Sequence, residues 1–373
     1  MEYVMLKDVC AINMGQSPDS DSYNDNGEGV PFFQGNADFG ERYPVTRKWC
    51  SAPTKMAFSE DILISVRAPI GAVNYAREEC CIGRGLAALT PDKTKVSSEF
   101  IFWLLKGKND ELNSKGTGST FKAIGRKVLE ETKVPNIPLE KQLECSEILE
   151  KVYAVIQHRK SEIQMMDDLI KARFVEMFGD PVSNSYGLSE ATLPKLGEFG
   201  RGVSKHRPRN DPRLLDGQYP LIQTGDIANA GLYITSYNST YSELGLQQSK
   251  MWNKGTLCIT IAANIAKTAI LEFDACFPDS VVGFVANERT NNIFIHYWFS
   301  FFQEMLESQA PESAQKNINL KILSELKVIV PEKEMQDEFS DFVRQIDKSK
   351  VAIQKALDET QLLFDSLMQQ YFG

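Results

Sequence analysis

Several features that mark other protein classes are missing from this 373-residue chain. Its seven cysteines include one adjacent pair, Cys80-Cys81, but no C-x-x-C spacing, and its three histidines lie far apart, so neither a disulfide framework nor a structural zinc site is indicated. No stretch of about 18 uncharged apolar residues occurs, and the N-terminus has no basic region followed by an apolar run. These absences predict a reduced, cytoplasmic protein that does not span a membrane.

The chain instead contains two copies of one pattern, displaced by 194 residues. A period of this size is too long for a solenoid repeat, so the repeated unit is a whole domain with its connector. Two similar domains suit a protein with two similar but non-identical targets. Eight identities between residues 119–134 and 313–328 carry the repeat, at Ser119, Lys122, Ile124, Lys127, Leu129, Glu131, Lys133 and Val134.

Each half is predicted to contain a mixed α/β domain followed by one long helix. Short apolar runs at 62–66 and 85–89 predict strands in the first half, and runs at 256–261 and 280–286 predict strands in the second. Helices are expected at 98–112 and 293–306. Gly and Pro then vanish from 139 to 178, which predicts a helix of roughly 40 residues that ends at Gly179-Asp180-Pro181. The predicted division is 1–138 and 180–331 for the domains, and 139–179 and 332–373 for the helices.

Each long helix carries a single apolar stripe, which is typical of a helix that packs on a partner helix. We therefore expect an α+β fold in which two antiparallel helices form a coiled-coil spacer between the two domains. The alternative is that each helix packs on its own domain. The first stripe is expected to comprise Ile148, Val152, Val155, Ile163, Met166, Ile170, Phe174 and Met177.

Catalytic motifs are also missing. The sequence has no N-P-P-[YF] or D-P-P-Y tetrad, no glycine-rich loop for S-adenosylmethionine, no Walker A motif and no H-E-x-x-H. One nuclease-like pattern, Pro91-Asp92 with Glu131-Thr132-Lys133, could supply acids and a lysine for a metal ion. Its second-half counterpart, Pro278-Asp279, lies 187 rather than 194 residues further on, which argues against a repeated nuclease site.

The remaining features are those of a binding protein with local basic surfaces. The formal charge of −9 argues against indiscriminate coating of nucleic acid. Residues 201–213, however, carry five Lys or Arg against one acid, whereas the matching first-half stretch, 19–28, is acidic. Amides that follow short strands in both halves can read base edges, although each is also a common turn residue. The predicted DNA-binding residues are Gln34, Asn36, Arg47, Lys48, Arg67, Arg84, Lys115, Ser119 and Lys122 in the first half, and Arg201, Lys205, Arg207, Arg209, Arg213, Gln223, Lys267, Ser313 and Lys316 in the second.

The duplicated order of these motifs resembles the DNA-specificity subunit of type I restriction-modification systems. The resemblance covers the whole chain and rests on 66–71, 124–142, 171–181, 223–227 and 318–336. It implies two target-recognition domains, each of which reads one half of a split, asymmetric double-stranded DNA site. It also implies that the long helices set the gap between the half-sites and bind two modification subunits.

The same resemblance implies that the chain is not itself catalytic and holds no cofactor or metal. S-adenosylmethionine would be bound by the modification subunits, which methylate adenine. ATP and Mg would be bound by two restriction subunits where the system includes them. Two alternatives remain open at this point: an unrecognised DNA-modifying enzyme, and a two-domain protein–protein adaptor on a coiled coil.

Overall fold

The computed structural model describes residues 2–118, 122–262, 265–309 and 320–373. The chain divides into two compact units, each assembled from segments that are distant in sequence. Unit 1 comprises Met1–Lys160 together with Lys355–Gly373, and unit 2 comprises Ser161–Gln354. The boundary falls within both long helices, so each unit includes part of each helix. None of the helices in the described part of the chain has the length and apolarity needed to cross a bilayer.

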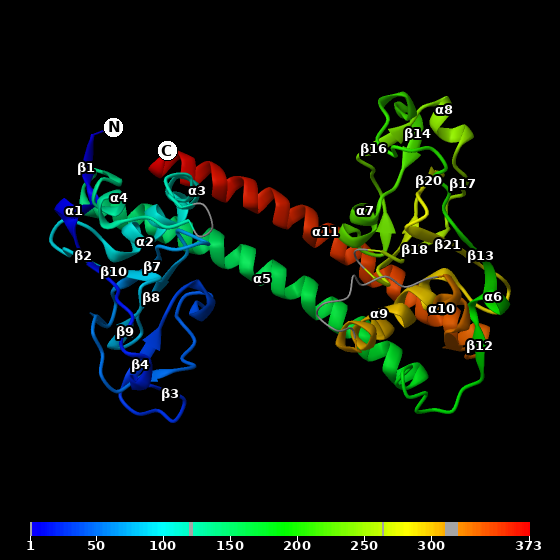
Figure 1. The fold of residues 1–373 in the computed structure, drawn as a ribbon, viewed down its shortest axis with the longest axis horizontal. Coiled ribbons are helices and arrows are strands. Elements are labelled where there is room, and N and C mark those ends of the chain that lie inside the picture. Colours follow the sequence, from blue (N-terminus) through cyan, green and yellow to red (C-terminus); the bar gives the residue numbers. More distant parts are fainter. Residues whose placement is uncertain (1, 119–121, 263–264, 310–319) are drawn as a thin grey trace. The chain divides into compact units, whose positions relative to one another are not determined.

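Unit 1 contains two sheets and a small strand pair (Figure 1). The four-stranded sheet is antiparallel, and its order is β2-β10-β7-β8, whereas the five-stranded sheet, β3-β5-β4-β9-β6, contains the parallel pair β4 and β9. The strands are β1 (Tyr3–Met5), β2 (Cys10–Met14), β3 (Tyr23–Asn24), β4 (Val30–Phe33), β5 (Trp49–Cys50), β6 (Met56–Ala57), β7 (Ile62–Ser65), β8 (Val73–Tyr75), β9 (Cys80–Ile82), β10 (Leu86–Pro91) and β11 (Lys133–Pro135), and the short helices are α1 (Leu6–Val9), α2 (Ser98–Gly107), α3 (Asn109–Ser114) and α4 (Arg126–Glu130).

Unit 2 repeats this plan, with the sheets β13-β21-β18-β19-β15 and β16-β14-β20-β17. The counterpart of the parallel pair β4 and β9 is β14 and β20, and β15 also pairs in parallel with β19. β12 pairs with β22 as β1 pairs with β11. The strands are β12 (Glu190–Thr192), β13 (Gly197–Arg201), β14 (Leu215–Leu221), β15 (Tyr233–Ile234), β16 (Ser239–Tyr241), β17 (Met251–Trp252), β18 (Leu257–Thr260), β19 (Thr268–Leu271), β20 (Ala275–Cys276), β21 (Val281–Ala286) and β22 (Lys327–Ile329), and the helices are α6 (Leu193–Leu196), α7 (Thr224–Asn229), α8 (Glu243–Gln247), α9 (Asn292–Gln309) and α10 (Leu320–Glu325).

The strand registers show which residues of the two units correspond. Leu86 lies opposite Ser65 in unit 1, and Val281 lies opposite Thr260 in unit 2. β18 and β21 of unit 2 therefore correspond to β7 and β10 of unit 1 with a displacement one residue longer than the 194 seen in the sequence. The strand β13, by contrast, begins several positions earlier than that displacement would place the counterpart of β2. The sequence displacement holds for the segments around β11 and β22 but changes upstream, because the loops between the strands differ in length.

The two long helices begin and end within one residue of the predicted bounds. α5 spans Leu139–Phe178 and α11 spans Lys333–Phe372, each 40 residues or about 60 Å long. Gly179 follows α5 with a φ of +74°, a conformation that glycine adopts at low cost and that ends the helix. The predicted helix at 98–112 is wrong in one respect: the backbone leaves the helical region at Lys108, which separates α2 from α3.

In unit 1, α5 packs antiparallel on α11 and both helices pack on α2. The Phe364 ring of α11 lies 5.7 Å from the Trp103 ring of α2 and 5.9 Å from the Tyr153 ring of α5. Arg159 of α5 donates to the carbonyl of Ala356 on α11. The two arrangements that the sequence offered as alternatives thus occur together, since each helix contacts both its partner and its own domain.

The same packing recurs in unit 2. The Phe174 ring of α5 lies 5.3 Å from that of Phe339 on α11 and 5.4 Å from that of Phe294 on α9. Seven of the eight residues of the predicted stripe are buried or half-buried, and contact on two sides widens the buried face beyond them. Val155 was expected to lie in the seam but is 42% exposed, whereas its neighbour Ile156 is buried.

A buried glutamine joins the first turn of each long helix to the domain before it. In unit 2, Gln336 Nε2 donates to the carbonyls of Arg289 (3.0 Å) and Pro331 (2.9 Å), and Gln336 Oε1 accepts from the Thr290 hydroxyl (2.8 Å). In unit 1, Gln142 makes the corresponding bonds. These amides fix the direction in which each long helix leaves its domain.

Candidate functional site

In unit 1, Gln34 and Arg84 lie at the ends of the parallel strands β4 and β9. Beyond these strands, the Gly83 amide donates to the Phe33 carbonyl (2.8 Å), and the Gly85 amide donates to the Gln34 carbonyl (3.1 Å). Both Gln34 and Arg84 are exposed. The fold therefore brings together, on adjacent backbone segments, a carboxamide and a guanidinium, the groups that best read adenine and guanine edges.

Two further predicted cations extend this edge of unit 1. The amide of Val66 donates to the Gly85 carbonyl (2.8 Å), and the amide of Ala68 donates to the Lys122 carbonyl (3.0 Å). Arg67 therefore lies on the segment between the Arg84 turn and Lys122, and both Arg67 and Lys122 are exposed. Residues that are far apart in sequence thus form one edge.

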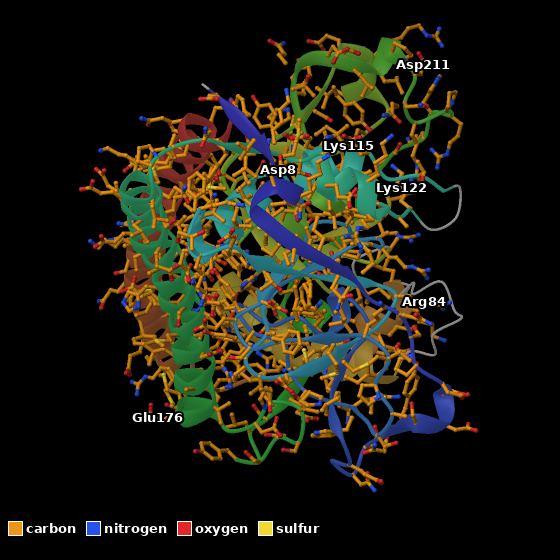
Figure 2. The ribbon with its side chains drawn as sticks, turned by 90° about the vertical axis from the view of Figure 1, so that its left-hand side faces the viewer. Asp8, Arg84, Lys115, Lys122, Glu176 and Asp211 are labelled. Atoms are coloured by element: carbon orange, nitrogen blue, oxygen red, sulfur yellow. The ribbon has the colours of Figure 1, made fainter. Side chains whose placement is uncertain are left out.

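Lys115 lies on the same side of unit 1 as Arg84 and Lys122, away from α5 (Figure 2). Its ammonium is 2.5 Å from a carboxylate oxygen of Glu111, one turn earlier in α3. An exposed pair of this kind is weak and can exchange its partner for a phosphate. We refer to Gln34, Arg67, Arg84, Lys115 and Lys122 as the unit 1 edge.

Asn36, Arg47 and Lys48 lie beside this edge. Asn36 begins the short turn after β4. The Arg47 guanidinium donates to the Ala37 carbonyl in that turn (3.3 Å), and the Lys48 carbonyl accepts from the amide of Phe32 in β4 (2.9 Å). Gln34, Asn36, Arg47, Lys48 and Arg84 therefore lie around the end of β4.

Arg42, which was not singled out from the sequence, anchors the loop that carries Arg47 and Lys48. Its guanidinium donates to Glu99 of α2 (2.5 Å) and to Glu150 of α5 (2.6 Å). No motif announces such a residue, because its two partners lie 57 and 108 residues away in the chain. The loop is thereby tied to the long helix.

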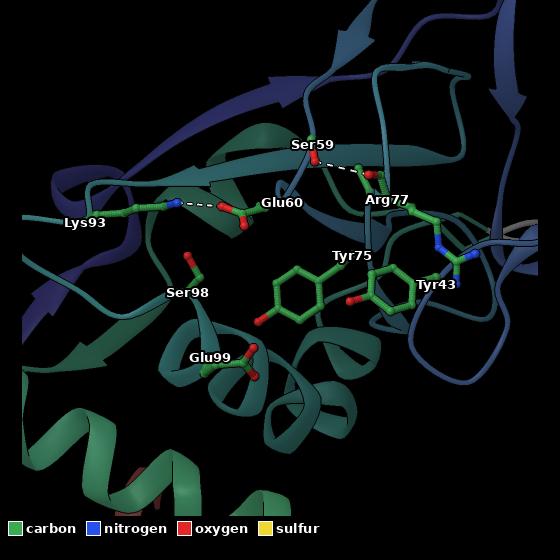
Figure 3. Close-up of a pocket in the computed structure, with 9 residues that line it drawn as sticks. Tyr43, Ser59, Glu60, Tyr75, Arg77, Lys93, Ser98 and Glu99 are labelled. Carbon is green, nitrogen blue, oxygen red and sulfur yellow. Dashed lines mark hydrogen bonds and ion pairs between the residues drawn. The ribbon is translucent and has the colours of Figure 1, made fainter.

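A polar cavity of about 630 Å³ opens close to this anchor in unit 1 (Figure 3). Lys93 and Glu60 form an ion pair in its wall (2.6 Å), and the Ser59 hydroxyl donates to the Arg77 carbonyl (3.1 Å). Across the described ranges, no three His, Cys, Asp or Glu side chains converge as a metal site would require.

In unit 2, the basic loop between β13 and β14 is partly neutralised. Arg209 lies 2.5 Å and Arg207 3.6 Å from the carboxylate of Asp279, while Arg213 lies 2.7 Å from that of Asp211. Hydrogen bonds from Arg213 hold the pKa of Asp211 well below its usual range. Three of the five cations of residues 201–213 therefore pair with two acids, one more acid than the sequence shows locally.

Arg201 and Lys205 retain an open charge. Both are exposed, and within the described part of the chain neither forms an ion pair. The amide of Lys205 donates to the side chain of Gln248 (2.7 Å), which fixes the backbone of the loop at this point. Lys267 is also exposed and lines a cavity of about 350 Å³ beside His296.

Gln223 follows β14 as Gln34 follows β4, in the same kind of turn. The amide of Gln223 donates to the carboxylate of Asp226 (2.8 Å), and the amide of Gln34 donates to that of Asp38 (2.7 Å). Asp226 therefore acts in turn formation. The Gln223 carboxamide also donates to the Ser239 hydroxyl (3.3 Å).

The structure separates the two Pro-Asp pairs of the nuclease-like pattern. Pro91-Asp92 lies at the end of β10, whereas Pro278-Asp279 lies in the turn between β20 and β21. They are not equivalent positions of the repeat. Three other predicted residues, Ser119, Ser313 and Lys316, lie outside the described residues.

Comparison with known proteins gives a consistent assignment. The type I restriction modification DNA specificity domain matches residues 1–165 and 190–360, once in each half of the chain. A candidate specificity subunit of the type I restriction enzyme MjaX from Methanocaldococcus jannaschii is 45% identical over 156 residues, which is 42% of this chain and 37% of that protein. The type I restriction enzyme EcoBI specificity subunit from Escherichia coli is 21% identical over 98% of this chain and 83% of its own length.

Solved structures show the same fold. The S subunit of a type I restriction-modification system from M. genitalium superposes with a TM-score of 0.61 at 16% identity, over 100% of this chain and 96% of that one. A chain from a type I restriction-modification system, in a study of its assembly and conformational transition, gives a TM-score of 0.56 at 16% identity, over 100% and 97%.

Proposed function

This chain belongs to the type I restriction-modification DNA specificity family, and from that premise we propose that it is the non-catalytic subunit that selects DNA for a modification and restriction complex. Unit 1 reads one half of a split, asymmetric site and unit 2 reads the other. The observation that carries the proposal is the repeated turn after β4 and β14, which presents an exposed glutamine in each unit and, in unit 1, places it beside the exposed Arg84. Base contacts of this kind specify sequence, while neighbouring Lys and Arg position the phosphates.

The long helices supply the second part of the function. They carry apolar side chains that remain exposed: Met165 of α5 is 64% exposed, and Val351 and Leu362 of α11 are 63% and 70% exposed. Large exposed apolar patches mark surfaces that bind other proteins, and we take these side chains as part of such a surface. We assign these faces to two modification subunits and, where the system includes them, two restriction subunits. S-adenosylmethionine, ATP and Mg would be bound by those partners.

The experiment that tests this function is a methylome comparison. Host DNA would be sequenced at single-molecule resolution with and without this gene, in cells that express the modification subunit of the same system. Loss of N6-methyladenine from one split motif is the expected result. An unchanged methylome in cells that contain the modification subunit would refute the proposal and favour a protein–protein adaptor.

Lys205 provides a more local test, because its charge has no acidic partner among the described side chains. Changing Lys205 to Ala should weaken DNA binding by the assembled complex and reduce the slope of log K against log salt by about 0.9, the value for one phosphate contact. Lys254→Ala is the matched control, since Lys254 is an exposed cation of the same unit that pairs with Glu272. Equal slopes for wild type and Lys205→Ala would remove Lys205 from the interface.

A further inference from the structure

The turn that carries Arg84 has a counterpart in unit 2 whose charge is reversed. The Val66 amide donates to the Gly85 carbonyl in unit 1 (2.8 Å), and the Ile261 amide donates to the Ser280 carbonyl in unit 2 (3.0 Å). The residues of these two hydrogen bonds are displaced between the units by the same number of positions as the paired strands β7 and β10 are from β18 and β21. Arg84, which precedes Gly85, therefore corresponds to Asp279, which precedes Ser280.

The segments that approach this turn are reversed in charge as well. Gly15 in unit 1 and Gly202 in unit 2 occupy the same place, since their amides donate to the Leu86 and Val281 carbonyls, which begin β10 and β21. The loop after Gly15 includes the acidic stretch 19–28, and the loop after Gly202 is basic. In unit 1 the turn is basic and the loop that approaches it is acidic, whereas in unit 2 the turn is acidic and the loop is basic.

Because of this exchange, both units present guanidinium groups at the same turn. Unit 1 supplies one directly from Arg84. Unit 2 supplies Arg209 and Arg207 from the loop, and the carboxylate of Asp279 holds them there at 2.5 and 3.6 Å. In both cases the turn adjoins the strand end that carries a glutamine, Gln34 or Gln223.

The Arg84 backbone is rigidly placed beside Gln34. A Cβ on Gly85 would lie 2.2 Å from the Gln34 carbonyl oxygen, and a Cβ on Gly83 would lie 3.1 Å from the Gln34 Cα. Glycines are therefore needed on both sides of Arg84 for this close approach. In the described part of the chain, the Arg84 guanidinium has no ion-pair partner, so a fixed backbone presents a free planar donor group.

We propose that these guanidinium groups read a guanine in each half-site: Arg84 for unit 1, and Arg209, held by Asp279, for unit 2. A guanidinium donates two parallel hydrogen bonds to guanine O6 and N7 from a rigid planar fork, a geometry that the flexible ammonium of lysine holds less well. The inference rests on the proposed function and makes it specific, because it assigns Arg84 and Arg209 to base reading and the other cations to phosphates.

The test compares Arg84→Lys with wild type in the assembled complex with its modification subunits. A library of duplexes randomised in both half-sites would be selected for binding, and the preference at each position measured. Arg84→Lys should reduce discrimination at one G·C position of one half-site by about 5- to 150-fold. The other half-site should remain unchanged. Arg126→Lys is the matched control, since Arg126 is exposed on α4 and pairs with Glu130.

Variants of unit 2 give an independent test in the same selection experiment, because they should change base preference in the other half-site. Arg209→Lys and Asp279→Asn should each relax one G·C position in the half-site that Arg84→Lys leaves intact. Arg209→Lys keeps the charge of the loop, so its effect does not depend on whether Asp279→Asn alters the loop conformation. Agreement of the two variants would support the assignment of the pair.

The outcomes separate the inference from the proposed function. A wild-type complex that selects no sequence would refute both. A wild-type complex that selects a split site, with Arg84→Lys selecting the identical site, would overturn the inference alone. Uniformly weaker binding of Arg84→Gln to all sequences, with a salt slope reduced by about one, would identify Arg84 as a phosphate contact and would also overturn it.

Discussion

The link between each long helix and its domain depends on one buried amide, and replacing Gln336 with Ala tests this most directly. The change removes three hydrogen bonds of 2.8–3.0 Å. The Thr290 hydroxyl and the Pro331 carbonyl belong to buried residues and would lose a partner, at a cost of about 1–3 kcal/mol each. The Arg289 carbonyl belongs to an exposed residue and can bind water instead. We expect a loss of about 3 kcal/mol in the free energy of unfolding, after a small gain from the higher helix propensity of Ala.

Urea and thermal unfolding would measure this loss, with Gln345→Ala as the control. Gln345 lies in the same helix and is exposed, so its replacement should change stability by less than about 0.5 kcal/mol. For a unit of this size, the Gln336 variant should melt about 6–12 °C lower. Hydrogen exchange should increase first at the start of α11 and in the segment 287–291, where the lost bonds lie. A difference of under about 1 kcal/mol between the two variants would show that the amide bonds are replaceable and that the reasoning is wrong.

Three further predictions concern the spacer, a partly buried histidine and a glycine. Inserting about four residues, one helical turn, after Met166 should change the number of base pairs between the half-sites in the methylome but not their bases; altered bases would contradict the spacer role. Burial, with a smaller contribution from Lys350, lowers the pKa of His296 to about 4. The unfolded chain therefore binds this proton first as pH falls below about 6.5, so the free energy of unfolding of the wild type should fall by about 2 kcal/mol more than that of His296→Phe between pH 7.5 and pH 5. Urea unfolding would measure this, and equal losses would exclude His296 as the cause. Gly202→Ala places a Cβ 2.3 Å from the Phe277 carbonyl oxygen and should lower the free energy of unfolding by about 1–3 kcal/mol. Gly225→Ala is the control, since a Cβ there has nothing within 4 Å and should leave stability unchanged. Similar stability of the two variants would show that the loop relaxes freely.

Features that depend on local sequence were predicted well. The bounds of α5 follow from the disappearance of Gly and Pro after residue 138 and their return at Gly179, and helix termination is a local event. The duplication and the α+β class follow in the same way, from residues within short windows. The position of the apolar seam was less accurate, because α5 packs on α2 or α9 as well as on α11, and two contact directions widen and rotate the buried face.

The candidate site shows where sequence reasoning ended. The sequence by itself determined that residues 201–213 are basic and that a glutamine follows a strand in each half. Only the tertiary structure decided that Asp279 pairs with Arg209, and that Arg84 lies beside Gln34. It also moved the correspondence of this turn by one position from that seen in the sequence, which makes Asp279 the counterpart of Arg84. The physical reason is that charge pairing and close backbone approach depend on distance in space, and the fold brings together residues that 50 to 70 positions separate along the chain.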